Sequence, residues 1–125
     1  MAAGDLKGDN CIVIEVTAGA AVAKGDLVHI EADDKKWDPT ADADVGKFGV
    51  ANTAAAADGD SFMAVIYGPV EVATTAAAIG KGQYVEADAK KVKVAAMTNY
   101  GEVVGTAMES VGAAGGNITI FVGMM

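Results

Sequence analysis

The stretch EADDKKW at residues 31–37 returns as EADAKKV at residues 86–92, with five identities in seven positions. Each copy follows a Lys-Gly pair by a few residues, at 24–25 in the first case and at 81–82 in the second. Acidic residues followed by lysines between apolar segments are typical of a solvated hairpin turn. The return of such a turn in the second part of the chain predicts two similar structural units.

The repetition extends downstream of the hairpin turn. FGVA at 48–51 corresponds to VGTA at 104–107, and in both halves a loop containing glycine precedes a further apolar run. The spacings are nearly but not fully constant, and the small differences fall in loops, where insertions cost little free energy. We therefore expect one repeat at 24–68 and a second at 81–123, with the N-terminal arm 1–10 and the first strand outside both.

Short segments of alternating apolar and polar residues run along the chain, for example CIVIEVT at 11–17 and KVKVA at 91–95. A period of two is the pattern of a β-strand. Pro69 lacks a backbone N–H and is expected to break a ladder or to mark a sheet edge. The alanine-rich runs 53–57 and 74–78 are far shorter than the roughly 12 to 15 residues that an isolated helix needs. The sequence therefore predicts an all-β fold with at most short helical turns.

The length of 125 residues predicts a single domain over 1–125. Neither repeat could bury its apolar face alone, because a meander of a few strands is marginal in water. We therefore expect the two tandem pseudo-repeats to pack on each other as a small barrel or sandwich of short antiparallel strands.

The charge balance limits the possible partners. The chain has 17 acidic and nine basic residues, a net charge of −8, and every basic residue is a lysine. A nucleic-acid-binding protein needs a basic patch, so nucleic acid is not an expected partner. The same sign argues against binding to an anionic membrane. No long apolar run of the kind that spans a membrane and no signal peptide is recognisable, so we expect the chain to stay in the cytoplasm in which it is made.

The sequence has few residues suited to catalysis. The run GDSF at 59–62 superficially matches the nucleophile block of one class of esterases, but the only histidine, His29, precedes Ser61 instead of following it. A serine nucleophile needs an imidazole base that is held by a carboxylate. The single Cys11 has no partner for a disulfide or a CxxC site. No catalytic residue, no cofactor-binding residue and no cofactor is predicted.

One acidic loop has some of the features of a cation site. Residues 38–44 place carboxylates at Asp38, Asp42 and Asp44, loosely as in a calcium loop. The loop lacks the central glycine and the closing bidentate glutamate, and its counterpart at 93–100 has no carboxylate. No metal site is therefore predicted, and a weak cation site in this loop remains an open alternative.

Five apolar residues are candidates for burial against a partner, and all of them except Trp37 stand where a monomer gains little from an apolar side chain. They are Leu6, Trp37, Tyr100, Met124 and Met125. For Trp37 two interpretations stay open, because a large aromatic residue whose counterpart is Val92 serves either in the core or as an interface anchor.

The order of these motifs resembles that of the small capsid cement proteins, or decoration proteins, of tailed viruses. The resemblance spans nearly the whole chain and is carried by KGDLV at 24–28, FGVA at 48–51, IGKGQYVEAD at 79–88, VVGTAME at 103–109 and the glycines at 115–116. Two features depart from the family. Gly105-Thr106-Ala107 stands where the family usually has Gly-Val-Ala, and the loop 38–44 is unusually acidic.

The resemblance implies a non-enzymatic protein that binds the outer surface of an assembled viral shell and stabilises it. Its implied partners are the major capsid protein and further copies of itself in a homotrimer. Its implied location is the capsid exterior of the virion, after a period in the host cytoplasm. Two alternatives remain: a non-viral structural or carbohydrate-binding β-sandwich module, and a small hydrolase that would use Ser61, His29 or the loop 38–44.

Overall fold

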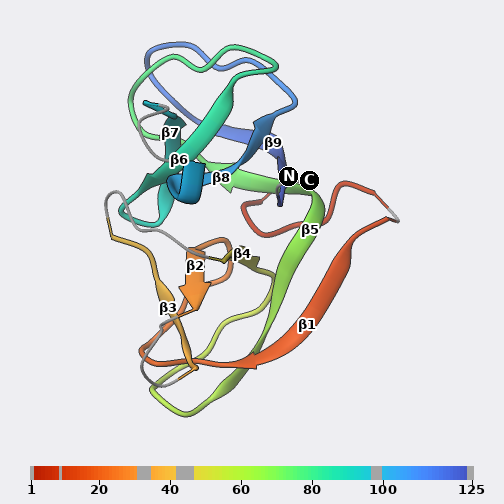
Figure 1. Ribbon diagram of the computed structural model, residues 1–125, viewed down its shortest axis with the longest axis vertical. Coiled ribbons are helices and arrows are strands. Elements are labelled where there is room, and N and C mark those ends of the chain that lie inside the picture. The colour runs from red at the N-terminus through yellow and green to blue at the C-terminus, as the bar shows by residue number, and fades with distance from the viewer. Residues whose placement is uncertain (1, 9, 31–34, 42–46, 97–99, 124–125) are drawn as a thin grey trace.

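The computed structural model of the chain describes residues 2–8, 10–30, 35–41, 47–96 and 100–123. Within these ranges the regular structure is almost entirely β, which confirms the predicted all-β fold (Figure 1). The elements are β1 (Ile12–Thr17), β2 (Leu27–Ile30), β3 (Trp37–Pro39), β4 (Phe48–Ala51), β5 (Ser61–Ala73), β6 (Tyr84–Asp88), β7 (Lys91–Val94), the 3-10 helix η1 (Tyr100–Glu102), β8 (Val103–Ala107) and β9 (Asn117–Val122).

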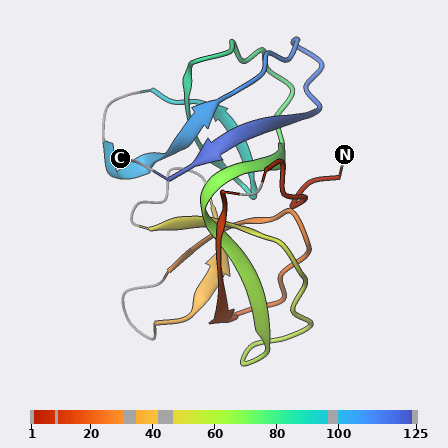
Figure 2. The ribbon, with the colours of Figure 1, turned by 90° about the vertical axis from the view of Figure 1, so that its right-hand side faces the viewer.

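The strands form one curled antiparallel sheet in the order β3-β2-β4-β5-β9-β8-β6-β7, with β1 beside β5. The long strand β5 connects two parts of the molecule. Its beginning lies between β1 and β4, and its end lies beside β9. Figure 2 shows β1 to β4 below and β6 to β9 above, with β5 passing through both parts. We call residues 11–67 the first half and residues 68–123 the second half.

β5 continues through Pro69, so of the two expected roles of this proline the break of the ladder is wrong, whereas the position at a sheet edge agrees with the structure. Pro69 pairs with Phe121 of β9, and on the other side its carbonyl oxygen accepts a hydrogen bond from the N–H of Lys7 at 3.1 Å. The N and O atoms of a strand residue point to the same side of the strand. The missing N–H of Pro69 therefore faces the N-terminal arm, and the pairing with β9 does not need it.

The buried apolar side chains form two clusters. The smaller cluster lies in the first half and includes Trp37. The larger cluster takes Leu27 and Val50 from the first half and Val85 and Ile120 from the second half. Contact between the halves thus buries apolar surface that each small sheet would otherwise expose to water.

Pairings in the first half recur in the second half at a nearly constant spacing along the chain. The recurring bridges are Ala18–Trp37 with Thr74–Val92, and Val22–Ala55 with Ile79–Val111. The same spacing relates β1 to the end of β5, because Thr17 pairs with Ser61 while Ala73 pairs with Asn117. The repeats at 24–68 and 81–123 stay a prediction, and these pairings extend the correspondence to the first strand, which the sequence placed outside them.

The N-terminal arm lies along the end of β5 as a short additional strand. The N–H of Gly4 donates to the carbonyl oxygen of Glu71 at 2.7 Å, and the N–H of Glu71 donates to that of Asp5 at 3.0 Å. Leu6 forms an antiparallel bridge with Val70. The arm therefore covers one edge of the sheet, on the side of β5 that faces away from β9.

Candidate functional site

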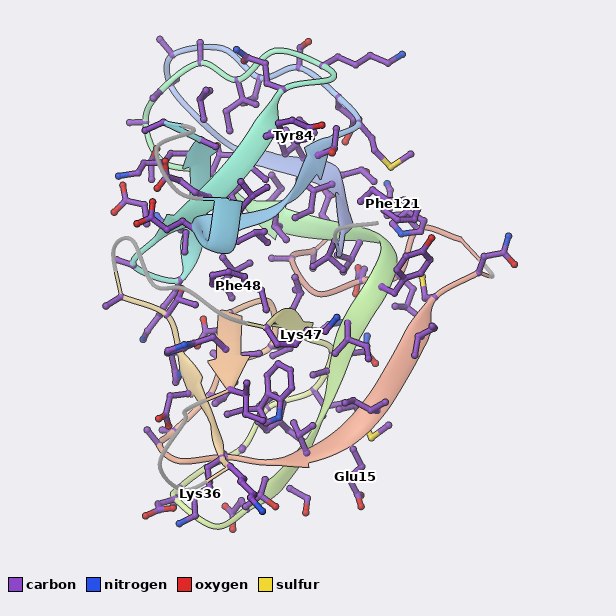
Figure 3. The ribbon with its side chains drawn as sticks, viewed as in Figure 1. Glu15, Lys36, Lys47, Phe48, Tyr84 and Phe121 are labelled. Atoms are coloured by element: carbon purple, nitrogen blue, oxygen red, sulfur yellow. The ribbon has the colours of Figure 1, made fainter. Side chains whose placement is uncertain are left out.

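One row of side chains crosses the outer face of the second half. Tyr84 pairs with Thr106, Thr106 pairs with Phe121, and Phe121 pairs with Pro69. Directly paired residues in a sheet share a face, so these four side chains lie on one side of the strands β6, β8, β9 and β5. Figure 3 labels Tyr84 and Phe121 in the upper part of the molecule. We call these four residues the aromatic row.

The aromatic row is partly open to solvent, and a ring contact supports it at Phe121. Tyr84 is 44% exposed, and the other three members are half-buried. The ring of Tyr67 meets that of Phe121 edge to face, with 4.9 Å between centroids and an angle of 86°. Met108, which follows Thr106 closely in the chain, is 43% exposed. Large aromatic side chains held in one geometry are typical anchors of protein interfaces.

The same side of the sheet is covered by protein in the first half. Leu27 pairs with Val50, and Val50 pairs with Val65, in a row that matches the aromatic row when the two halves are aligned. All three side chains are 0% exposed, because the second half packs over them. In the second half, the matching position of Leu27 is Tyr84, and the described residues leave it open. An apolar sheet face of this kind is suited to covering by another molecule.

The structure separates the five residues that are candidates for burial against a partner. Leu6 stands on the arm at the sheet edge and is 38% exposed. Trp37 is 6% exposed and packs in the core of the first half, so its side chain offers almost no surface to a partner. Tyr100 begins η1, and Met124 and Met125 lie outside the described residues. Interface roles for Leu6, Tyr100 and the two methionines stay predictions.

The sequence did not single out Tyr84, Phe121 or Met108. Tyr84 lies in β6 and Phe121 in β9, and the alternation with their neighbours gives the side-chain period of each strand. Alternation does not say which face another element covers, because both faces of β4 turn out to be buried. The available signal was the pair of aromatic residues at positions where the first half has Leu27 and Val65.

A charged cluster fixes the N-terminal arm beside the aromatic row. Glu71 is 6% exposed, accepts a hydrogen bond from the hydroxyl of Thr119 at 3.1 Å, and lies 3.8 Å from the ammonium of Lys7. The N–H of Thr119 donates to Glu109 at 2.6 Å, and this bond is the main reason that the pKa of Glu109 is lowered. A buried carboxylate such as that of Glu71 is retained only with such partners.

The arm is tied to the first half as well. The ammonium of Lys24 hydrogen-bonds Asp5, and this contact, followed by the N–H of Ala2, lowers the pKa of Asp5. The side-chain amide of Asn52 donates to the carbonyl oxygen of Gly4 at 2.9 Å. Gly4 has a φ of +89°, and a Cβ there would lie 2.5 Å from the carbonyl oxygen of Ala51. The arm thus bridges both halves through close contacts that only glycine permits at this position.

The described residues do not bring the chemically reactive side chains together. His29 lies in β2, where its ring stacks on Phe48 at 6.4 Å, whereas Ser61 begins β5, and β4 separates these two strands. Within the described ranges, no group of three His, Cys, Asp or Glu residues could hold a metal ion. Asp42 and Asp44 of the acidic loop lie outside these ranges. No helix in the described part of the chain is long and apolar enough to cross a membrane.

Comparison with known proteins identifies the fold and the family of the chain. No curated protein matches it. Among solved structures, the crystal structure of the head fiber gp8.5 N base of bacteriophage phi29 matches with a TM-score of 0.62. The match has 16% identity and covers 90% of this chain and 94% of that chain, so the two proteins share a fold. The family model of the phage cement proteins matches residues 6–124. The protein is therefore a member of the phage cement protein family, with the role of a capsid decoration protein.

Proposed function

We propose that this cement protein binds the exterior of an assembled phage capsid through the major capsid protein, as a homotrimer, and without catalysing a reaction. The observation that carries the proposal is the aromatic row, which leaves an apolar sheet face open on a protein of the cement family. The matching side chains Leu27, Val50 and Val65 of the first half are 0% exposed. Burial of the aromatic row against the shell would complete the same packing in the second half.

Mass action explains how such binding stabilises a shell. A ligand that binds only the assembled lattice lowers the free energy of the lattice relative to its separated subunits. Packaged DNA presses on the seams between capsid subunits, and a protein seated across a seam resists their separation. Many copies act at once, so a modest binding free energy for each copy is sufficient.

The charge of the protein fits a position outside the shell. At a net charge of −8 and without arginine, the chain has little attraction for the packaged genome. An acidic protein is instead steered toward a shell exterior of complementary charge. Labelling of intact virions with a membrane-impermeant amine reagent should therefore modify the lysines of the protein before any internal protein reacts.

A homotrimer would raise the strength of attachment without new contacts. Three linked copies convert the second and third binding events into intramolecular ones, so that avidity exceeds the affinity of a single copy. Light scattering of the free protein and native mass spectrometry of protein released from capsids would measure the oligomeric state. We expect the protein released from capsids to contain three chains per oligomer. Monomers in both measurements would contradict this part of the proposal.

Co-sedimentation with cement-free expanded capsids tests the proposal. The wild-type protein should pellet with capsids and saturate at a fixed number of copies. Tyr84→Ser together with Met108→Ser should weaken binding by roughly tenfold or more, as expected for exposed apolar anchors. Ile30→Ser is a matched control, because Ile30 is 36% exposed on the first half, away from the aromatic row. Equal binding by the double variant and the control would exclude the surface around Tyr84 and Met108 as the contact with the capsid.

A further inference from the structure

β1 has an open edge. Its hydrogen-bonded neighbour is β5, and the parallel bridge from Ala18 to Trp37 closes the sheet only beyond the end of β1. In the described part of the chain no other element pairs with residues 12–16. Figure 1 shows β1 at the right-hand rim of the first half, with its outer side turned away from the rest of the ribbon. An open strand edge presents unpaired N–H and C=O groups to a partner strand.

The matching edge in the second half is covered. The end of β5 corresponds to β1, because Ile14-Glu15-Val16 matches Val70-Glu71-Val72 when the two halves are aligned. There the N-terminal arm adds as a strand antiparallel to β5. Nothing comparable covers β1 within the described residues. The chain thus contains two related edges, one with its cover strand and one without.

The covered edge shows what kind of segment fits. Glu71 uses both its N–H and its C=O to bond the arm. Glu15 stands at the matching position of β1. Three residues further on, the N–H of Ala18 donates a hydrogen bond of 2.8 Å to the carbonyl oxygen of Asp60, on the β5 side of the strand. Successive residues of a strand direct their N–H and C=O groups to opposite sides, so the N–H and C=O of Glu15 point away from β5, to the open edge.

The side chains of the arm complete the recognition at the covered edge. Leu6 lies beside Val70, and Lys7 stands 3.8 Å from the carboxylate of Glu71. On β1 the corresponding positions are Ile14 and Glu15. Glu15 is exposed, and Figure 3 shows its side chain pointing away from the ribbon. No ion pair with Glu15 is present among the described residues.

We propose that the open edge of β1 receives an extended segment of the major capsid protein as an additional antiparallel strand. The segment places an apolar side chain beside Ile14 and a lysine or arginine beside Glu15, as Leu6 and Lys7 do at the covered edge. This inference rests on the proposed function, and it adds to the aromatic row a second contact that backbone hydrogen bonds provide.

A second copy of this chain is a poorer occupant of the edge. Its own arm is already paired with β5 and held by Asp5 and Gly4. Antiparallel pairing of two β1 strands in the register centred on Glu15 would set two carboxylates directly opposite each other, which is unfavourable. A basic segment from another protein meets neither obstacle, and the net charge of −8 attracts it.

Binding to cement-free expanded capsids is measured for wild type, Glu15→Gln, Glu15→Lys and Asp88→Asn. Asp88→Asn is the matched control, because it removes one carboxylate from a partly exposed strand residue of β6, far from β1 in the sheet order. Glu15→Lys should weaken binding by about tenfold or more and Glu15→Gln by about threefold, while the control stays within about twofold. Circular dichroism and thermal melting verify that all four proteins are folded.

Hydrogen exchange by mass spectrometry supplies the second measurement. Peptides covering residues 10–18 should exchange more slowly in the capsid-bound wild-type protein than in the free protein. Capsid binding of the wild type with unchanged exchange in these peptides, or equal binding by Glu15→Lys, overturns the inference and leaves the proposed function intact. Failure of the wild type to bind capsids overturns both. Slower exchange in concentrated free protein would identify a second copy as the occupant, and would overturn the assignment to the capsid protein.

Discussion

The ammonium of Lys7 lies 3.8 Å from the carboxylate oxygen Oε1 of Glu71, and this pair joins the N-terminal arm to the end of β5. Glu71 is 6% exposed, so removal of Lys7 would leave a nearly buried carboxylate whose one remaining side-chain partner among the described residues is the hydroxyl of Thr119. The arm is therefore a structural element of the sheet and not a free tail.

Deletion of residues 2–7 should destabilise the protein and expose the end of β5. The deletion removes the backbone hydrogen bonds to Pro69 and Glu71 together with the ion pair, at about 1 kcal/mol for each hydrogen bond. Urea denaturation should show a lower free energy of unfolding, and light scattering should show self-association through the uncovered edge. The milder variant Lys7→Met should lose stability without self-association. Unchanged stability after the deletion would contradict the observed arm contacts.

Acidification should loosen the arm and the adjacent loop. Hydrogen bonds hold the pKa of Asp5 and the pKa of Glu109 below their ordinary values. A carboxyl group whose pKa is lower in the folded state stabilises the fold above its unfolded pKa, and this stability is lost as the pH falls through the folded value. The melting temperature should therefore drop between about pH 5 and pH 2. Asp5→Asn and Glu109→Gln should each show a shallower drop, and identical pH profiles would refute the assignment.

Trp37→Ala should be one of the most damaging single substitutions in the first half. The side chain is 6% exposed, and replacement of a buried large aromatic residue by alanine costs about 3 to 5 kcal/mol. Trp37→Phe should retain most of the stability, because it keeps most of the packed volume. Capsid binding by folded Trp37→Phe should equal that of the wild type. A wild-type unfolding curve for Trp37→Ala would show that Trp37 is not a core residue.

Gly68→Ala should cost more stability than Gly59→Ala. Both residues have positive φ, +116° and +92°, so alanine is strained at each, by about 1 to 2 kcal/mol. At Gly68 a Cβ would also lie 2.9 Å from the Cα of Cys11, whereas at Gly59 nothing lies within 4 Å. The difference between the two free energies of unfolding therefore measures the close approach of the chain at the centre of β5. Equal losses would mean that this approach is not tight.

The sequence was sufficient to predict the strands but not their environment. CIVIEVT at 11–17 and KVKVA at 91–95 contain β1 and β7, because a period of two depends only on local backbone geometry. The pairing of Leu6 with Val70 has no local signal, since one apolar residue in a short arm defines no pattern. The sequence left two roles open for Pro69, and only the structure selects the sheet edge, because the side of a strand that needs its N–H depends on its neighbours.

The candidate surface was harder to predict for the same reason. Leu27 and Tyr84 occupy matching positions, yet one is 0% and the other 44% exposed. The difference arises from the docking of the second half on the first, and alternation along a strand carries no information about docking. Trp37, the most conspicuous residue in the sequence, is buried in the core, while the open surface lies around Tyr84 and Phe121.

We propose that this cement protein contacts the capsid with the outer face of its second half. An electron cryomicroscopy reconstruction of expanded capsids, decorated with the purified protein to saturation, tests it most directly. We expect density on the outside of the shell in which Tyr84, Met108 and Phe121 lie against the major capsid protein. A reconstruction in which these three side chains face solvent while another surface contacts the shell would contradict it.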